Sequence, residues 1–246
     1  GRSLRRKLSS GTLRAKRPAQ LAVDTSNTMP APGSVFCSFI SLLLLALKVV
    51  SAPGDLDRGF QSSRGTSNAV QTMVEQPDGK LIIGGDFTAV DDIARNRIAR
   101  LNPDGTLDRR FLSGLSGADR QVRIAVLQDD GKILIGGAFW TVNGVARRMI
   151  ARLNPDGTLD TGFLNGLAGV GSGATFGVYS IALQSDGKVL IGGTIQTVNG
   201  VLRGGVARLH PDGSLDSTFM EGMTGADSVV RTVVPLNTPP LRNTRA

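Results

Sequence analysis

Gln-Ser-Asp-Gly-Lys-Val-Leu-Ile-Gly-Gly, residues 184–193, is the stretch of sequence that decides the fold. An Asp-Gly turn leads into a short apolar run that ends in a glycine pair. The turn glycine supplies the positive φ that a tight hairpin needs, so the stretch predicts a turn followed by a β-strand. The same pattern occupies residues 76–85 and 128–137, which makes it one part of a repeat.

Two more landmarks recur in the same order in each unit. The Asp-Gly-Lys turns lie 52 and 56 residues apart, and the Pro-Asp-Gly turns repeat both spacings. The four additional residues of the longer unit fall in the glycine-rich segment 169–177, where we expect a loop. The Pro-Asp-Gly turns are Asn102–Gly105, Asn154–Gly157 and His210–Gly213, and the Leu-Asp-x-x-Phe motifs are Leu56–Phe60, Leu107–Phe111, Leu159–Phe163 and Leu215–Phe219.

One unit is predicted to hold four short strands. Its strong apolar runs, such as Lys188–Ile191, indicate sheets covered on both faces, because a half-exposed strand would alternate apolar and polar residues. A period near fifty residues with four strands per unit is typical of a propeller blade. We therefore expect an all-β fold, a propeller-like array of four-stranded antiparallel blades. The strands expected in the middle unit are Val122–Leu127, Lys132–Phe139, Met149–Leu153 and Leu159-Asp160, the last anchored by Phe163. The phenylalanine of each Leu-Asp-x-x-Phe motif is expected to be a core anchor, because it is the aromatic present at the same place in all four copies.

The repeats begin and end with partial units. A lone Leu56–Phe60 motif precedes three full units, and Ser228–Val234 reads as the first strand of a fourth. Because propellers close with about four to eight blades, we expect an incomplete propeller. Further blades would come from missing sequence or from self-association.

These motifs resemble the delta-60 repeat family over roughly residues 54–234. The resemblance implies a β-propeller-like repeat from large, mostly bacterial, exported or surface proteins, and it implies no established enzymatic activity. Two substitutions depart from the pattern: Asp91-Asp92 replaces Asn-Gly in the first unit, and Ile195 replaces a phenylalanine in the third. The residues that carry the resemblance are Gln184–Gly193, Val198–Gly200, Val206–Leu209 and Pro211–Phe219.

The segments outside the repeats predict export and a short tail. Residues 1–28 are basic and precede the first methionine, Met29, so they are expected to be disordered or upstream, non-native sequence. Within 29–52, Val35–Leu47 is an uncharged apolar run that suits a signal peptide, with an uncleaved anchor or a buried segment as alternatives. The repeats are assigned to 53–234 and a disordered tail to 235–246. The expected location is extracellular or at the cell surface.

Composition excludes several functional classes. The net charge of +8 comes from the two ends of the chain, and the repeat region is slightly acidic, which argues against a nucleic-acid partner. The single cysteine, Cys37, precedes the repeats, and His210 is the only histidine. The repeats therefore cannot form a disulfide or a thiolate metal site, and a single histidine removes most zinc and triad chemistry.

Three recurrent motifs have both a functional and an architectural interpretation. Residues 102–108 resemble a calcium loop, but Arg100 and Phe111 stand where ligands would be needed, so a turn closed by aspartates is favoured. The glycine pairs resemble phosphate loops but lack a following helix, so close packing or a bulge is favoured. Arg100, Arg152 and Arg208 could line an anion channel, but pairing with Asp108, Asp160 and Asp216 is favoured.

We predict an exported, non-catalytic β-propeller scaffold that binds a protein or glycan partner at the cell surface. Trp140 and Tyr179 are single aromatics at non-equivalent positions and are the candidates for a binding surface. The alternative is a propeller enzyme of the lactonase or lyase type, with a carboxylate-held metal in the central channel. No catalytic, cofactor or metal residue is assigned, and a membrane is expected to contact only the N-terminal apolar segment.

Overall fold

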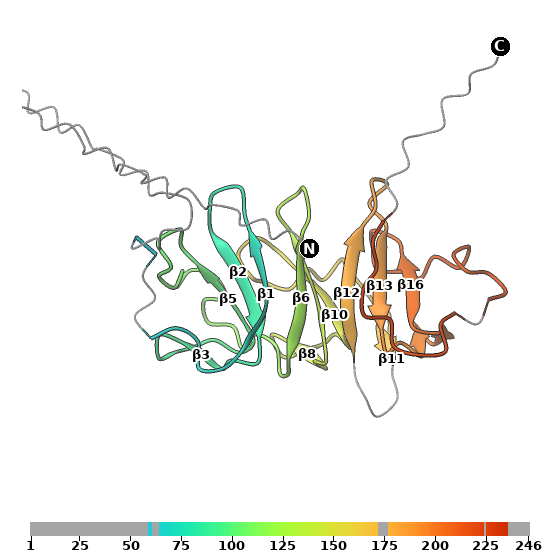
Figure 1. Cartoon of the computed structure of the whole chain (residues 1–246), viewed down its shortest axis with the longest axis horizontal. Coiled ribbons are helices and arrows are strands. Elements are labelled where there is room, and N and C mark those ends of the chain that lie inside the picture. The colour runs from blue at the N-terminus through green and yellow to red at the C-terminus, as the bar shows by residue number, and fades with distance from the viewer. Residues whose placement is uncertain (1–58, 61–63, 172–176, 224, 236–246) are drawn as a thin grey trace, which may run out of the picture. The chain divides into compact units, whose positions relative to one another are not determined.

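The computed structural model describes residues 59–60, 64–171, 177–223 and 225–235, which contain only strands, turns and loops (Figure 1). The predictions for residues 1–28, 29–52 and 236–246 fall outside this part of the chain. In the described part, no helix has the length and apolar character needed to span a bilayer.

Each repeat folds into one blade, a small antiparallel sheet whose second strand lies in the middle, together with an outer hairpin. Blade 1 contains β1 Val70–Glu75, β2 Leu81–Gly85 and β5 Ile98–Leu101, with the hairpin β3 Ala89–Val90 and β4 Ile93–Ala94. Blade 2 contains β6 Val122–Leu127, β7 Ile133–Gly137 and β10 Ile150–Leu153, with the hairpin β8 Thr141–Val142 and β9 Val145–Ala146. Blade 3 contains β12 Val178–Leu183, β13 Val189–Gly193 and β16 Val206–Leu209, with β11 Val170–Gly171, β14 Thr197–Val198 and β15 Val201–Leu202 beside it.

The all-β propeller-like fold is confirmed, but each main sheet has three strands instead of the expected four. The predicted fourth strand of blade 2 is a single bridge between Leu153 and Leu159. It stops there because Asp160 Oδ1 accepts a hydrogen bond from the Gly162 amide, which bends the chain away from the sheet. Blades 1 and 3 have the same bridge, Leu101 to Leu107 and Leu209 to Leu215.

The outer hairpins were not predicted from the sequence. In blade 2, Asn143 and Gly144 have φ values of 50° and 78°, the backbone of a two-residue turn with both positions left-handed. In blade 1, Asp91 and Asp92 hold the same turn with φ values of 48° and 62°. The Val-Asn-Gly motif therefore forms the turn of a hairpin. The hairpin could not be recognised from the sequence because its strands are only two residues long.

The glycine pairs provide close packing and face a bulge, as predicted. The β6–β7 register shifts between Val122 and Ile124, opposite Gly136 and Gly137. A Cβ on Gly136 would lie 2.7 Å from Val178 Cγ1 of the next blade, and one on Gly137 would collide with the carbonyl oxygen of Gln121. Only glycine lets the blades approach this closely.

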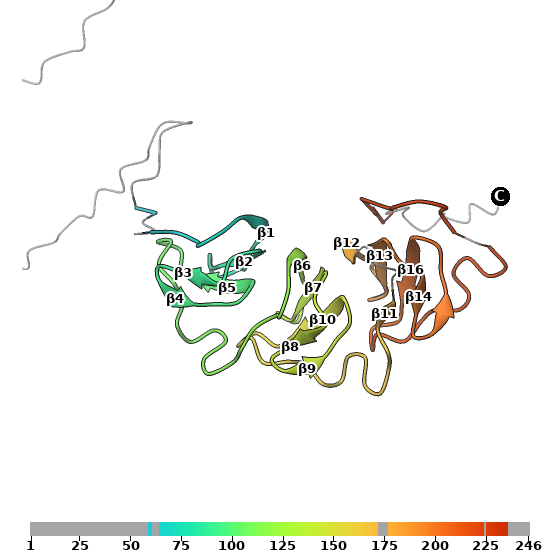
Figure 2. The same cartoon turned by 90° about the horizontal axis from the view of Figure 1, so that it is seen from below.

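Successive blades pack through their first strands. β1 lies against β6, and β6 lies against β12, so these three strands are neighbours (Figure 2). Figure 2 shows the β3–β4 and β8–β9 hairpins on the opposite side of their blades. The side that carries β1, β6 and β12 therefore brings residues from three repeats together.

The Leu-Asp-x-x-Phe phenylalanines, expected to be core anchors in all copies, are fully buried in only two. Phe111 packs with the core of blade 2, and Phe163 with the core of blade 3, so each anchors its own blade to the following one. Phe219 is half-buried, and Phe60 is 40% exposed. No described blade follows Phe219 to cover its ring.

Two other expectations are corrected. The expected loop 169–177 begins with β11, which pairs with β14, and its residues 172–176 lie outside the described part. Ser228–Val234 forms no strand, although Val230 N donates to Gly193 O at 3.2 Å and Val233 N donates to Ser180 Oγ at 3.1 Å. This segment lies beside blade 3 without a described second strand to pair with it.

Candidate binding site

A polar cluster of residues that do not recur crosses three blades at their first strands. Asp86 follows β2, Gln121 precedes β6, Arg123 lies on β6, and Tyr179 lies on β12. Gln121 Nε2 donates to Asp86 Oδ2 at 2.6 Å, and Arg123 Nε donates to Gln121 Oε1 at 2.7 Å. The Arg123 guanidinium carbon is 4.3 Å from the Tyr179 ring centroid. We call these four residues the first-strand cluster.

The first-strand cluster arises because the blades are similar in backbone but differ at these positions. Arg123 and Tyr179 occupy the same strand position in blades 2 and 3, where blade 1 has Gln71. The positions equivalent to Asp86 hold Ala138 and Thr194. A surface made of unlike residues on equivalent positions is asymmetric, as recognition of one particular partner requires.

The chemistry of the first-strand cluster fits recognition. All four residues are half-buried, so part of each side chain remains accessible. Tyr and Arg are enriched at the energetically dominant positions of protein interfaces. An aromatic ring also offers an apolar face, while Asp, Gln and Arg offer hydrogen-bonding groups, which together suit a polar ligand with apolar faces such as a sugar.

Trp140 is separated from this cluster. It precedes β8 on the outer hairpin, is 41% exposed, and has the Arg148 guanidinium carbon 5.6 Å from its ring centroid. Its backbone N donates to Asp119 Oδ1 at 2.9 Å. The two predicted aromatics thus stand on different elements, and only Tyr179 belongs to the first-strand cluster.

The recurrent arginines have the predicted architectural role. Arg152 Nε donates to Asp160 Oδ2 at 2.7 Å, and Lys132 Nζ contacts the same oxygen at 3.0 Å. The guanidinium carbon is 4.8 Å from the Phe163 ring centroid, and Nη1 donates to Pro211 O of blade 3 at 2.7 Å. Arg152 therefore links a strand, the phenylalanine anchor and the next blade. Arg100 and Arg208 make the equivalent contacts with Asp108 and Phe111 and with Asp216 and Phe219.

These ion pairs hold the recurrent aspartates in their charged form. Burial alone would raise the pKa of Asp160, but hydrogen bonds from Lys132, Arg152 and the Gly162 amide outweigh it and lower the pKa to about 2. For Asp216, the hydroxyl of Thr218 is the main group that lowers the pKa, with Arg208 and Lys188 adding to it. These carboxylates serve the structure of each blade.

The calcium-like motif forms the predicted turn. Asp104 Oδ1 accepts hydrogen bonds from Thr106 N at 3.0 Å and Thr106 Oγ1 at 2.7 Å, which lower the pKa of Asp104. Asp108 Oδ1 accepts from Arg110 N at 2.9 Å, and its other oxygen binds Arg100. Across the described ranges, no group of three or more His, Cys, Asp or Glu side chains has the proximity needed to hold a metal ion.

The comparisons with known proteins agree with the architecture. Residues 76–111, 128–163 and 184–219 match the family model described as "Domain of unknown function (DUF5122) beta-propeller". No curated protein matches the chain. Each matched segment begins just before a second strand and ends at the phenylalanine of Leu-Asp-x-x-Phe. Fold, repeat pattern and family model together identify the chain as a β-propeller-like repeat protein.

Proposed function

We propose that this chain is an exported, non-catalytic scaffold of the delta-60 repeat type, which binds a protein or glycan partner at the cell surface. The first-strand cluster is the site that we assign to the partner. The observation that carries the proposal is the division between recurrent and non-recurrent polar residues. Recurrent ones, such as Arg152 and Asp160, bind each other within the architecture, whereas Arg123 and Tyr179 vary on a half-exposed surface.

The glycan branch has a direct test. The purified chain would be applied to an array of surface glycans, with Arg123→Ala and Tyr179→Ala as site variants. We expect both variants to lose about tenfold or more in affinity, because each removes a side chain of the kind that dominates interfaces. Trp140→Ala is the matched control, since it removes an exposed aromatic elsewhere and should leave binding unchanged. Binding that is insensitive to both site variants would assign recognition to another surface.

The protein branch needs a cell-based measurement. The same variants would be cross-linked to intact cells whose surface carries the partner, and the yields of cross-linked product would be compared. Trp140→Ala again serves as the control. We expect the cross-linked product to disappear in Arg123→Ala and Tyr179→Ala. If neither glycans nor cell-surface proteins distinguish these variants from the parent chain, the first-strand cluster is not the partner site.

The non-catalytic and exported parts of the proposal have separate tests. Stoichiometric calcium or manganese in the purified protein would contradict a purely scaffolding role. For export, residues 29–60 would be fused to a reporter that is active only outside the cytoplasm. We expect activity, and we expect its loss when Leu43→Arg and Leu45→Arg interrupt the apolar run. A silent parent fusion would overturn the proposed location.

A further inference from the structure

The connector between blades 2 and 3 contains one of the three Asn-Gly pairs in the chain. These pairs are Asn143-Gly144, Asn165-Gly166 and Asn199-Gly200. Asparagine is a chemically labile residue, and a following glycine hinders attack on its side chain least, because glycine has no Cβ. The three pairs therefore have the same intrinsic reactivity, and the structure around each pair decides which of them can react.

The reaction open to an Asn-Gly pair is intramolecular deamidation. The backbone nitrogen of the glycine attacks Cγ of the asparagine and closes a succinimide ring, while the proton of that nitrogen and the side-chain NH₂ group leave together as ammonia. Water then opens the ring at either of its carbonyl groups, which yields aspartate or isoaspartate. Ring closure requires a carboxamide that can turn toward the glycine nitrogen and a backbone that can follow it.

The carboxamide of Asn143 is held by hydrogen bonds at both ends. Its Oδ1 accepts from Gly117 N at 3.0 Å, and its Nδ2 donates to Gly157 O at 3.1 Å. Asn143 N also donates to Gly117 O at 2.8 Å, which fixes the backbone of the hairpin turn. This carboxamide joins the connector, the outer hairpin and the Pro-Asp-Gly turn, so it cannot rotate without breaking both of its bonds.

Asn199 is held in the same way, one blade later. Its Oδ1 accepts from Gly169 N at 3.0 Å, and its Nδ2 donates to Gly213 O at 3.3 Å. Its backbone N donates to Gly169 O at 2.8 Å. Ring closure at Asn199 therefore also requires that the contact between connector and hairpin opens first.

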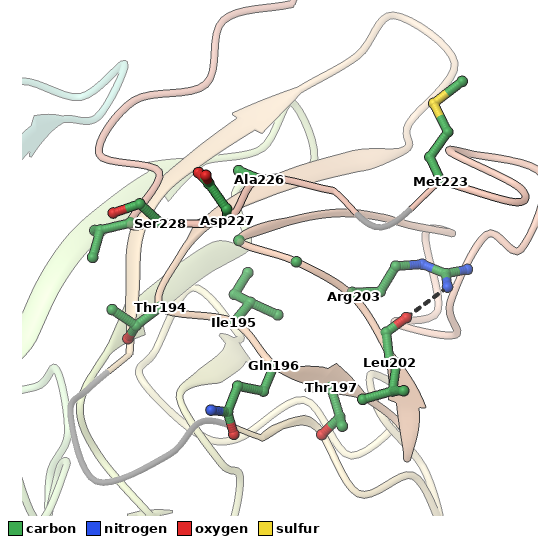
Figure 3. Close-up of a pocket in the computed structure, with 13 residues that line it drawn as sticks. Thr194, Ile195, Gln196, Thr197, Leu202, Arg203, Met223, Ala226, Asp227 and Ser228 are labelled. Carbon is green, nitrogen blue, oxygen red and sulfur yellow. Dashed lines mark hydrogen bonds between the residues drawn. The ribbon is translucent and has the colours of Figure 1, made fainter.

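The protection of these two asparagines does not depend on exclusion of water. Gly144 and Gly200 are both exposed. Figure 3 shows a cavity of about 850 Å³ along the hairpin that carries Asn199, with Thr197 and Leu202 in its lining. Water therefore reaches both hairpins, and the hydrogen bonds of the carboxamides are what prevents ring closure.

Asn165 lacks these restraints. It is exposed, and within the described residues neither its side chain nor the amide of Gly166 takes part in a hydrogen bond. The adjacent bond from Leu167 N to Leu164 O, at 3.1 Å, spans the pair without using it. A Cβ on Gly166 would meet nothing within 4 Å, so there is room for the ring. The carboxamide can turn toward Gly166 N while the blades stay folded.

We propose that Asn165 is a site of spontaneous deamidation in the folded protein, whereas Asn143 and Asn199 react only when a blade junction opens. Isoaspartate at position 165 inserts a methylene group into the backbone of the turn 164–167. The neighbouring Leu164 N donates to Asp212 O of blade 3 at 2.8 Å, so the lengthened turn displaces a bond between two blades. Formation of isoaspartate therefore weakens the junction of blades 2 and 3.

The equivalent connectors show which side chains the turn accepts. Blade 1 has Ser113-Gly114 and blade 3 has Glu221-Gly222 at these positions, with the same turn bond at 3.1 Å. The φ of the glycine is 71° in both, close to the 67° of Gly166. Serine and a carboxylate thus fit the turn. Asn165→Ser is therefore a matched variant that cannot deamidate, and ordinary aspartate at position 165 should leave the junction intact.

Mass spectrometry of tryptic peptides tests the assignment, because trypsin places the three pairs on separate peptides, 133–147, 153–188 and 189–203. The folded full chain would be incubated at mildly alkaline pH in water labelled with heavy oxygen and then digested in ordinary water, so that only conversions during incubation carry the label. We expect Asn165 to convert at least about tenfold faster than Asn143 and Asn199, since each of these must first break two hydrogen bonds. Asn154 precedes a proline, which has no N–H to attack, and is the negative control on peptide 153–188.

The same incubation in urea removes the structural difference. The three pairs should then convert at rates that agree within about threefold, because no hydrogen bond holds any of the carboxamides. The proposal is wrong if Asn165 converts no faster than Asn143 and Asn199 in the folded chain. It is equally wrong if Asn165 converts only after urea is added.

Two variants connect the reaction with the blade junction. The Tm of the parent chain should fall as isoaspartate accumulates, whereas the Tm of Asn165→Ser should stay constant over the same incubation. Freshly prepared Asn165→Asp introduces the charge without the methylene group and should have the Tm of Asn165→Ser. A parent chain that accumulates isoaspartate without any change in Tm would contradict the proposed effect on the junction.

Discussion

The junction between blades 2 and 3 and the open end of blade 3 use the same residues in different surroundings. At the junction, Phe163 is fully buried and Arg152 reaches the next blade, whereas at the end Phe219 is half-buried and Arg208 contacts only its own blade among the described residues. Within one repeat the Arg, Asp and Phe contacts are the same. The energetic value of the motif is therefore expected to depend on the neighbour that covers it, as in other repeat proteins.

The largest effect should separate the two phenylalanines. Phe163→Ala leaves a cavity between two blades and is expected to reduce the free energy of unfolding by about 3–5 kcal/mol. Phe219→Ala should cost less than about 2 kcal/mol, since its ring is already partly in water. Urea unfolding of both variants measures the difference. Equal losses would show that the open end is as well packed as the junction.

Substitution of the two arginines should reduce stability in the same order, with smaller losses than at the phenylalanines. Arg152→Ala removes hydrogen bonds to Asp160 and Pro211 and leaves a largely buried carboxylate, at a cost of about 2–3 kcal/mol. Arg208 has no described hydrogen bond to a further blade, so Arg208→Ala should reduce the free energy of unfolding by about 1 kcal/mol less than Arg152→Ala does. Thermal unfolding of the pair at one pH compares them, and a larger loss for Arg208→Ala would contradict the importance of the interblade bond.

Acid should weaken the junction through Asp160. Its folded pKa of about 2 lies below the unfolded value of about 3.9, so its contribution of about 2 kcal/mol is present above pH 4 and is lost as pH falls toward 2. Asp160→Asn should lower stability at pH 7 and flatten the pH dependence between pH 4 and 2. A pH profile parallel to that of the parent chain would show that Asp160 is not the titrating group.

The glycines offer a finer comparison of rigidity. Gly136→Ala forces a methyl group against Val178 on an ordered strand and should cost about 1–3 kcal/mol. Gly192→Ala meets Val230 and Val233, which belong to no strand and can yield, so its cost should stay below about 1 kcal/mol. Calorimetry can resolve the pair. A similar penalty at Gly192 would mean that segment 230–233 is as firmly held as β12.

The smallest effect is expected in the outer hairpin of blade 1. Asp92 has a φ of 62° where blades 2 and 3 have glycine, so Asp92→Gly should stabilise the protein by about 0.5–1 kcal/mol. Gly144→Asp in blade 2 is the reverse experiment and should destabilise by a similar amount. A loss of stability in Asp92→Gly would indicate that its ion pair with Arg64 outweighs the backbone strain.

The architecture was predictable because the residues that set it recur. The spacing of Asp-Gly-Lys and Pro-Asp-Gly located the three main sheets, and the apolar runs matched the second strands, which are largely buried. The Asn143-Gly144 hairpin was missed because two-residue strands leave no alternation to detect. A fourth strand was wrongly predicted at Leu159 because an apolar residue at this position fits both a strand and a single bridge. Only the turn at Asp160 shows that the pairing ends after one bridge.

The first-strand cluster was predictable only in part. Tyr179 is recognisable in the sequence as an aromatic residue that breaks the repeat, whereas Asp86, Gln121 and Arg123 are ordinary polar residues there. Their relation depends on β1, β6 and β12 packing side by side, a contact between residues 35 or more positions apart. No local spacing rule encodes such a contact, because it depends on how neighbouring blades are aligned with each other.

The position of the first strand relative to the matched family segments gives the scaffold a modular character. β1, β6 and β12 each fill a six-residue interval just before a matched segment, and each begins with a valine. Val122 and Val178 lie against the second-strand glycines of the preceding blades, Gly84 and Gly136. The rest of the interval carries the residues that differ between blades. Under the proposed function, exchange of these six-residue segments would change recognition, while the turns, ion pairs and phenylalanine anchors lie outside the exchanged residues.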